Sequence, residues 1–174
     1  MKPSSSLGVT ATRIQTTRTL RMPSFFGDIL NAVLALIMWS LVVLVLLYVY
    51  RLPAMHRARV SLRKMAVKST DAYRAESSKM PVEAVQVAEN YNHLMEQPTL
   101  FYALILYIHC RQDPAYISNT TMLTEAWAYV ALRILHSLIQ CFYNRITLRF
   151  FVFVLSSCVL AHIALTVFAH EVSK

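Results

Sequence analysis

The stretch from Trp127 to Phe153, WAYVALRILHSLIQCFYNRITLRFFVF, decides the fold, because it is mostly apolar and yet carries polar side chains at helical spacing. Arg133, His136, Gln140 and Asn144 follow one another at offsets of three, four and four residues. Such offsets place the four side chains on one side of a single helix. An unpaired charge in hydrocarbon costs several kcal/mol (~2.5–3.5 for Arg at a helix centre), so the stripe predicts partners or a ligand.

The bulk composition is that of a membrane protein. Of the 174 residues, 56% are hydrophobic and only 15% are charged, whereas soluble domains are about one-quarter charged. The mean hydropathy is +0.45, and the length suits one domain. Both glycines precede the first apolar run, which disfavours turn-rich β architecture. The long continuous apolar runs exclude a transmembrane β-barrel.

Four apolar segments predict an all-α integral membrane protein, a four-transmembrane-helix bundle. We expect helices at about 29–50, 82–110, 126–143 and 148–170, within a single domain of residues 28–174. At a rise of ~1.5 Å per residue, the first segment covers a ~30 Å hydrocarbon core. Residues 1–27 form a basic, Ser/Thr-rich tail without acidic side chains, which we expect to be disordered. An organellar transit peptide and a start codon assigned too far upstream are the alternatives.

The positive charge is concentrated in the connections between helices. The formal net charge is +8, and eight Lys and Arg residues lie between positions 51 and 79. The positive-inside rule therefore places loops 51–81 and 144–147 in the cytoplasm, and the basic loop favours contact with anionic membrane lipids. Nucleic-acid binding is not expected, because no base-reading motif accompanies the charge.

A second polar cluster lies early in the predicted second helix, where Glu89, Asn92, His93 and Glu96 are spaced so that several share a face. Pro98 follows the cluster and predicts a kink. Because the second and third helices are expected to run antiparallel, both clusters should lie toward the cytoplasmic loops, and we expect them to form one shared site. Ion pairs Glu96–Arg133 and Glu89–Arg149 would neutralise the charges; fixing helix register is the alternative role for such pairs.

A cationic pocket at this place suits a small anionic ligand, since Arg binds a carboxylate bidentately or stabilises a thiolate. A metal is the competing ligand, because Glu89, His93, Glu96 and His136 could supply oxygen and nitrogen. The paired Glu-x-x-His pattern of ferritin-like centres is absent from the sequence, and we expect no metal. The three cysteines are widely spaced and odd in number, so we interpret them as small hydrophobic core residues.

Residues 83–153 resemble the MAPEG family, the membrane-associated proteins in eicosanoid and glutathione metabolism. The strongest likeness is AWAYVALRILHSLIQCFYNRITLRFF, with the Arg-x-x-His of Arg133 and His136 followed by Arg149. The ENYNHLMEQP stretch resembles the family's Asn-x-x-Glu segment on the second helix. The residues of these two motifs are most similar to those of the family's bacterial branch. This resemblance implies a multi-pass protein of the bacterial inner membrane.

The resemblance implies a homotrimer of four-helix subunits that binds glutathione between subunits, near the cytoplasmic side. Arg149 would stabilise the glutathione thiolate and so be the catalytic residue. The residues implied in glutathione binding are Asn92, His93, Glu96, Arg133, His136 and Gln140.

Several positions depart from the family pattern. His93 stands where the family usually has Asn, Gln140 where several members have Tyr, and Phe150 and Phe153 where some catalytic members have Ser and Tyr. The lost hydroxyls remove hydrogen-bond donors. The expected function is a glutathione-dependent transferase or peroxidase acting on lipophilic small-molecule electrophiles. The alternative is a non-catalytic membrane scaffold, or a lipid-binding trimer, with the same fold.

Overall fold

Helices account for every regular element in the part of the chain that the structure describes. The structure, a computed structural model, describes residues 25–61, 63, 70–117, 119–143 and 145–174. In chain order the elements are η1 (Phe25–Gly27), α1 (Ile29–Arg57), α2 (Asp71–Ser77), α3 (Val82–Arg111), α4 (Pro114–Ile117), α5 (Thr120–Leu138), the π-helical turn η2 (Ile139–Tyr143) and α6 (Ile146–Val172). The predictions for the tail up to residue 24 and for Asn144 fall outside the described residues.

Capping side chains set where two of the long helices begin. The Asp28 carboxylate accepts from the Leu30 amide at 2.9 Å and starts α1. The Asn119 side chain accepts from the amides of Thr121 and Met122 at 3.0 and 3.2 Å. Such N-caps satisfy amides that have no partner within the helix. The third long helix therefore begins at Thr120 and not near residue 126, because Asn119 caps a turn that apolar periodicity alone did not reveal.

The other boundaries also differ from the apolar runs. Helix α1 continues past Tyr50 to Arg57, because a charged side chain ends a hydrophobic run without breaking backbone hydrogen bonds. Helix α3 runs through the buried Pro98, and the kink there stays a prediction. The cysteines are not core residues: Cys110 and Cys158 are exposed and Cys141 is half-buried. That interpretation was wrong because apolar helices in this chain have outward faces as apolar as their inward ones.

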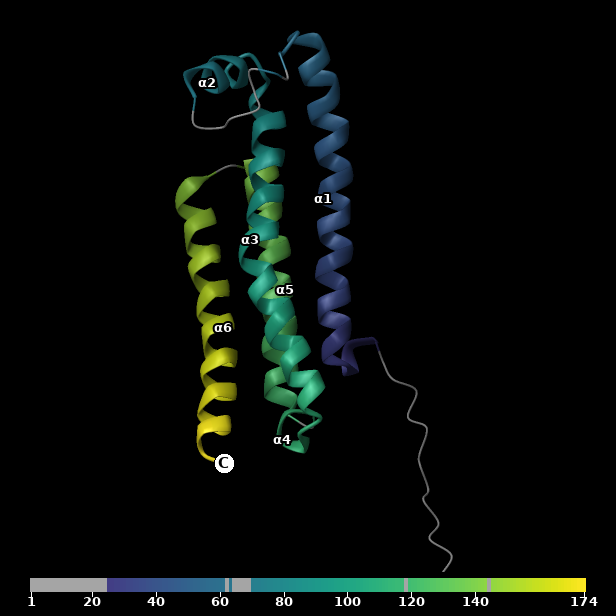
Figure 1. Cartoon of the computed structure of the whole chain (residues 1–174), viewed down its shortest axis with the longest axis vertical. Coiled ribbons are helices and arrows are strands. Elements are labelled where there is room, and N and C mark those ends of the chain that lie inside the picture. The colour runs from purple at the N-terminus through teal and green to yellow at the C-terminus, as the bar shows by residue number, and fades with distance from the viewer. Residues whose placement is uncertain (1–24, 62, 64–69, 118, 144) are drawn as a thin grey trace, which may run out of the picture.

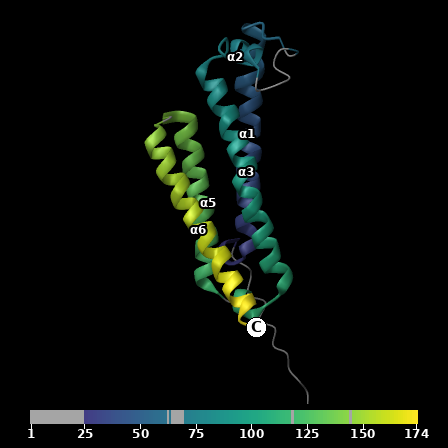
Figure 2. The same ribbon diagram turned by 60° about the vertical axis from the view of Figure 1, so that its left-hand side comes forward.

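The four long helices α1, α3, α5 and α6 lie side by side (Figure 1). The α1–α3 connection, which contains α2, and the α5–α6 turn lie toward one end, and the C-terminus lies at the other (Figure 1). Helix α1 packs against α3 and α5, and α5 packs against α6. The α5–α6 pair lies beside the α1–α3 pair (Figure 2). Both predicted polar clusters therefore lie toward the same end.

Two of the described helices, α1 and α6, are long and apolar enough to cross a membrane by length and composition. Less than a third of the most apolar part of each helix is buried in the single chain. Helices α3 and α5 carry the polar clusters, which lowers their hydropathy. The regular elements are thus all helical over the described residues, with two candidate spans, and crossing by α3 and α5 stays a prediction.

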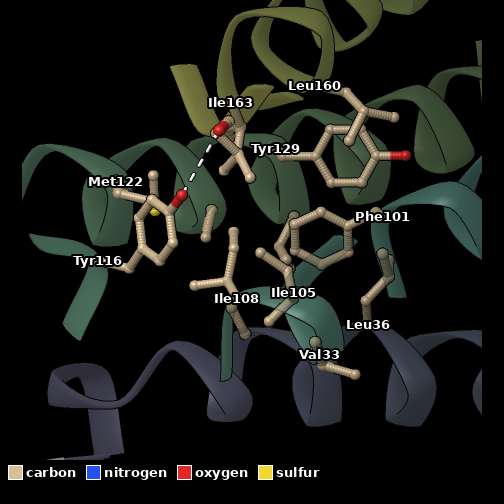
Figure 3. Close-up of a cluster of buried hydrophobic side chains, with 14 of the residues drawn as sticks. Val33, Leu36, Phe101, Ile105, Ile108, Tyr116, Met122, Tyr129, Leu160 and Ile163 are labelled. Atoms are coloured by element: carbon tan, nitrogen blue, oxygen red, sulfur yellow. Dashed lines mark hydrogen bonds between the residues drawn. The ribbon is translucent and has the colours of Figure 1, made fainter. Parts of the chain in front are cut away.

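A buried apolar cluster joins α1, α3, α5 and α6 away from the polar end (Figure 3). At its centre the rings of Phe101 and Tyr129 are stacked, with centroids 4.5 Å apart. Leu36 and Ile163 pack around them from the outer helices, and both are buried. Tyr129 precedes His136 by two helical turns on α5, so this packing fixes α3 against α5 close to the polar residues.

Candidate functional site

A cavity of about 210 Å³ lies where α3, α5 and α6 meet near the α5–α6 turn. The imidazoles of His93 on α3 and His136 on α5 form part of its wall, with ring centroids 6.2 Å apart. Arg149, from the first turns of α6, is partly buried and also lines it. The remaining lining residues are Ile146, Phe150 and Phe153. The structure therefore brings together three of the residues that the sequence analysis singled out.

Arg133 lies behind this wall, 1% exposed. Its Nε donates to the Tyr129 hydroxyl at 3.2 Å. Its guanidinium carbon is 5.3 Å from the Tyr129 ring centroid and 5.2 Å from that of Phe153. Its Nη2 is buried and has no hydrogen-bond partner in the described chain. The charge is thus held between two aromatic faces by cation–π attraction.

The predicted ion pairs do not form within the chain. The Glu96 side chain is 70% exposed, and its carboxylate lies 3.5 Å from His93 Nδ1. Among the described residues no salt bridge joins Glu96 to Arg133 or Glu89 to Arg149. The pairing prediction was wrong because Glu89 and Glu96 lie on the exposed side of α3, whereas Arg133 lies buried between Tyr129 and Phe153.

A layer of buried amides adjoins the cavity. The Asn90 amide donates to the Ser137 hydroxyl at 2.6 Å and to Cys141 Sγ at 3.3 Å. Gln140 is 0% exposed, and neither its amide nitrogen nor its amide oxygen has a hydrogen-bond partner in the described chain. It lies in the π-helical turn η2, a distortion frequently found at functional sites. A buried amide left unpaired costs ~1–3 kcal/mol, so this layer favours a polar partner.

The predicted site residues thus fall into three groups: those that line the cavity, those buried behind it and those exposed on α3. His93, His136 and Arg149 line the cavity, and Arg133 and Gln140 are buried near it. Asn92 and Glu96 lie on the exposed flank of α3 and line no wall of this cavity.

Sequence reasoning missed Asn90, Ser137 and Tyr129. A usable signal was present for the first of these, because Asn90, His93 and Gln97 follow at offsets of three and four. That set marks the face of α3 that turns inward. Tyr129 precedes Arg133 by four residues, the spacing at which two side chains on a helix meet.

The cavity is a basic environment. Arg149 is in its wall and Arg133 stands behind it, and no described carboxylate is among its lining residues; the exposed Glu96 contacts His93 outside the cavity. Within the described ranges, His, Cys, Asp and Glu do not gather in groups of three or more that could hold a metal ion. The preference for an anionic ligand over a metal stays a prediction, supported by this charge balance.

Comparison with protein families gives one match. The sequence model of the MAPEG family matches residues 29–169, which include all four long helices nearly complete and every residue that lines the cavity. No curated protein and no solved structure matches the chain. Because the matched segment covers most of the sequence, the protein belongs to the MAPEG family.

Proposed function

We propose that this protein is a membrane-bound, glutathione-dependent transferase or peroxidase that acts on lipophilic electrophiles. The observation that carries the proposal is the basic cavity at the α3–α5–α6 junction, with Arg149 and two imidazoles in its wall. Family membership supports the same reading, since the matched segment contains these residues. Glutathione is the co-substrate in this proposal, and Arg149 is the catalytic residue.

The residues present fit glutathione, a tripeptide with two carboxylates and a thiol. The Arg149 guanidinium can pair with a carboxylate or with the thiolate. Arg133 Nη2 and the Gln140 amide are buried donors that no group in the described chain uses. These donors can therefore form hydrogen bonds with a ligand that reaches behind the cavity wall.

The size of the cavity supports completion of the site by a second subunit. Its 210 Å³ is below the ~300–1,000 Å³ of ordinary ligand pockets. Asn92 and Glu96 lie exposed on the flank of α3, where a neighbouring chain of a homotrimer would meet them. In this arrangement the exposed pair contacts glutathione from one subunit, while Arg149 of the next subunit reaches the sulfur.

The chemistry proposed for Arg149 is electrostatic. The guanidinium lowers the free energy of the thiolate, which is the nucleophile. The sulfur forms a bond to an electrophilic carbon, and with a chlorinated aromatic the carbon–chlorine electron pair leaves as chloride while the thiol proton goes to solvent. With a peroxide, the sulfur takes one oxygen and the alcohol leaves; a second glutathione then yields the disulfide and water.

The membrane arrangement is part of the proposal. Helices α1 and α6 are candidate spans, and we place α3 and α5 across the membrane beside them, with their polar faces turned to each other and to α6. Loops 51–81 and 144–147 then lie on one side, which the Lys/Arg distribution assigns to the cytoplasm. A bacterial inner membrane and contact with its anionic lipids complete this arrangement.

The test replaces Arg149 with Ala and measures conjugation of glutathione to a chlorinated aromatic. We expect kcat to fall roughly 100-fold or more, the loss typical of removing one electrostatic donor. Arg145→Ala is the matched control, because Arg145 is exposed and lies at the same end of α6 without lining the cavity. A native protein that neither binds glutathione nor turns over any electrophile would show that the enzyme proposal is wrong.

The non-catalytic scaffold is a second candidate, favoured by one observation. Arg133 is already held by Tyr129 and Phe153, and phenylalanines line the cavity where hydroxyls would serve catalysis. A thermal-shift measurement with millimolar glutathione separates the two functions. A ligand that binds only the folded state stabilises it by ~2.7 kcal/mol at 100 times its Kd. Intact trimers without any shift would favour the scaffold.

A further inference from the structure

A cavity of about 550 Å³ lies between the last turns of α1 and the start of α3, at the end of the molecule where α2 lies (Figure 1). This volume falls within the ~300–1,000 Å³ of ordinary ligand pockets. Its walls come from α1, from α3 and from the connection between α2 and α3. We call it the α1–α3 cavity. It shares no lining residue with the basic cavity at the α3–α5–α6 junction.

The wall that α1 contributes changes from apolar to charged along the helix. Val49, Pro53 and Ala54 line the part nearer the middle of α1. Arg57, the last residue of α1, lines the other part, ~12 Å farther on than Val49 at ~1.5 Å per residue. Helix α1 is a candidate membrane span, and its continuous apolar run ends at Tyr50. With that run in the hydrocarbon, the cavity extends from the acyl-chain boundary into the headgroup layer.

A buried ion pair holds Lys79 in the wall of the cavity. The Glu76 side chain on α2 is buried, and its Oε1 lies 2.9 Å from Lys79 Nζ. The other carboxylate oxygen of Glu76 accepts from the Ser61 amide at 3.0 Å. The charge of Lys79 is therefore balanced within the chain, although its ammonium has further N–H groups that can donate to a ligand.

Two opposite charges in the wall have no ion-pair partner in the described chain. Arg57 from α1 and Glu83 from α3 both line the cavity, and neither forms a salt bridge with a described residue. Because Glu76 balances Lys79, the cavity presents one uncompensated cation and one uncompensated anion. This charge pattern complements a zwitterion, whereas a purely anionic ligand would place negative charge against Glu83.

A phospholipid with a primary ammonium in its headgroup has groups that match this wall. Its phosphate can pair bidentately with the Arg57 guanidinium and accept from the Lys79 ammonium. Its own ammonium can donate to the Glu83 carboxylate. The glycerol and the first carbons of the acyl chains can follow the apolar wall toward Val49. A soluble zwitterion would leave that apolar wall exposed to water.

We propose that the α1–α3 cavity binds the headgroup of phosphatidylethanolamine, a zwitterionic phospholipid with a primary ammonium. The bound headgroup bridges α1 and α3 through Arg57 and Glu83. This site selects a lipid by its ammonium, whereas the basic loop between α1 and α3 attracts lipids by their negative charge. The inference is independent of the proposed glutathione reaction, because the two cavities have separate walls.

The test measures lipid binding to the delipidated full-length protein by native mass spectrometry. Phosphatidylethanolamine, phosphatidylcholine and phosphatidylglycerol with identical acyl chains are compared. Phosphatidylcholine keeps the positive charge but has no N–H to donate, and phosphatidylglycerol has no positive charge. We expect one phosphatidylethanolamine per chain, bound roughly tenfold more tightly than either of the others, which is the typical effect of one hydrogen bond between charged groups.

Variants separate the two ends of the headgroup. Glu83→Gln should remove the preference for phosphatidylethanolamine and leave the three lipids bound alike. Arg57→Ala should weaken the binding of all three roughly tenfold, because each phosphate loses its main partner. Glu89→Gln and Arg51→Ala are the matched controls, since they make the same changes on the same two helices at residues that do not line the cavity.

A second measurement locates the lipid. Phosphatidylethanolamine with a diazirine next to its glycerol is irradiated with the protein in nanodiscs, and the labelled peptides are identified by mass spectrometry. We expect labels on residues 49–58 and 79–84, reduced by Arg57→Ala and retained by Arg51→Ala. Labels spread evenly over the apolar helices would overturn the proposal.

Three further results would also overturn it. Equal binding of phosphatidylglycerol, unchanged by Glu83→Gln, would show that the ammonium is not recognised. Displacement of phosphatidylethanolamine by inorganic phosphate at equal concentration would assign the cavity to a soluble anion. A disulfide between two copies of Ala58→Cys, in a protein without other cysteines, would show that the cavity is a contact between subunits.

Discussion

The imidazole of His93 on α3 meets that of His136 on α5 edge to face, with ring centroids 6.2 Å apart and an interplanar angle of 88°. This contact joins two polar clusters that are far apart in the sequence. Arg149 of α6 lines the same cavity, so three helices contribute to one wall.

Substitution of His93 should separate its polar role from its volume. His93→Leu is expected to weaken glutathione binding roughly tenfold, because loss of one polar contact costs ~1.4 kcal/mol. His93→Asn keeps a hydrogen-bonding side chain and should lose less. Isothermal titration of the detergent-solubilised protein measures both. His56→Leu, an exposed histidine at the end of α1, is the control, and unchanged affinity in His93→Leu would contradict a place in the site.

Removal of the Tyr129 hydroxyl should destabilise the fold. The hydroxyl accepts from Arg133 Nε, so Tyr129→Phe leaves a second unpaired nitrogen on a guanidinium that is 1% exposed. We expect the free energy of unfolding to fall by ~1–3 kcal/mol. Equilibrium unfolding in SDS measures the change. Tyr107→Phe, on the exposed side of α3, should leave it unaltered, and equal stability of the two variants would argue against this hydrogen bond.

The hydrogen bond from Asn90 to Ser137 should couple α3 to α5. A double-mutant cycle with Asn90→Ala and Ser137→Ala is expected to give a coupling energy of ~0.6–1.7 kcal/mol, the range for buried polar pairs in membrane proteins. The stability of each variant is measured by unfolding in SDS. Glu89→Ala alters the exposed neighbour on the same turn and serves as control. Strictly additive losses would show that the two side chains do not interact.

Protonation of Asp113 should release the C-terminal end. The Lys174 ammonium lies 2.6 Å from its carboxylate, and with the Ala115 amide and His170 it holds the pKa of Asp113 well below its usual range. A depressed pKa stabilises the folded C-terminus above the unfolded value of ~3.9, and this contribution is lost as pH falls through the folded value. Hydrogen exchange of residues 169–174, corrected for intrinsic rates, should show protection at neutral pH.

Two carboxylate-to-amide variants test whether Asp113 holds the C-terminal end. Asp113→Asn should lose protection of the C-terminal end already at pH 7, because the ion pair with Lys174 is gone. Asp71→Asn removes a fully exposed carboxylate that pairs with Arg74 on α2, and should leave exchange at the C-terminus as it is. Native-like protection in Asp113→Asn would mean that other contacts, such as Arg111 with Glu171, hold the end.

The sequence by itself determined the helical class, the family and the polar face of α5. Helical periodicity and apolar runs are local properties, so they sufficed to place Arg133, His136 and Gln140 on one buried side of the helix and its continuation. The family motif likewise depends only on residue order. The start of α5 was predicted less well, because a polar N-cap such as Asn119 cannot be found from the pattern of apolar residues.

Only the tertiary structure decided which side of α3 turns inward. Asn90, His93 and Gln97 share one helical face, and Glu89, Asn92 and Glu96 crowd another, so periodicity alone admits either. Packing against α5 and α6 turns the first set inward, because Ser137, His136 and Ser157 supply its partners; Asn90 is buried, and His93 and Gln97 are half-buried. Packing also gave Arg133 two aromatic faces in place of a carboxylate, since Tyr129 and Phe153 reach it and Glu96 does not.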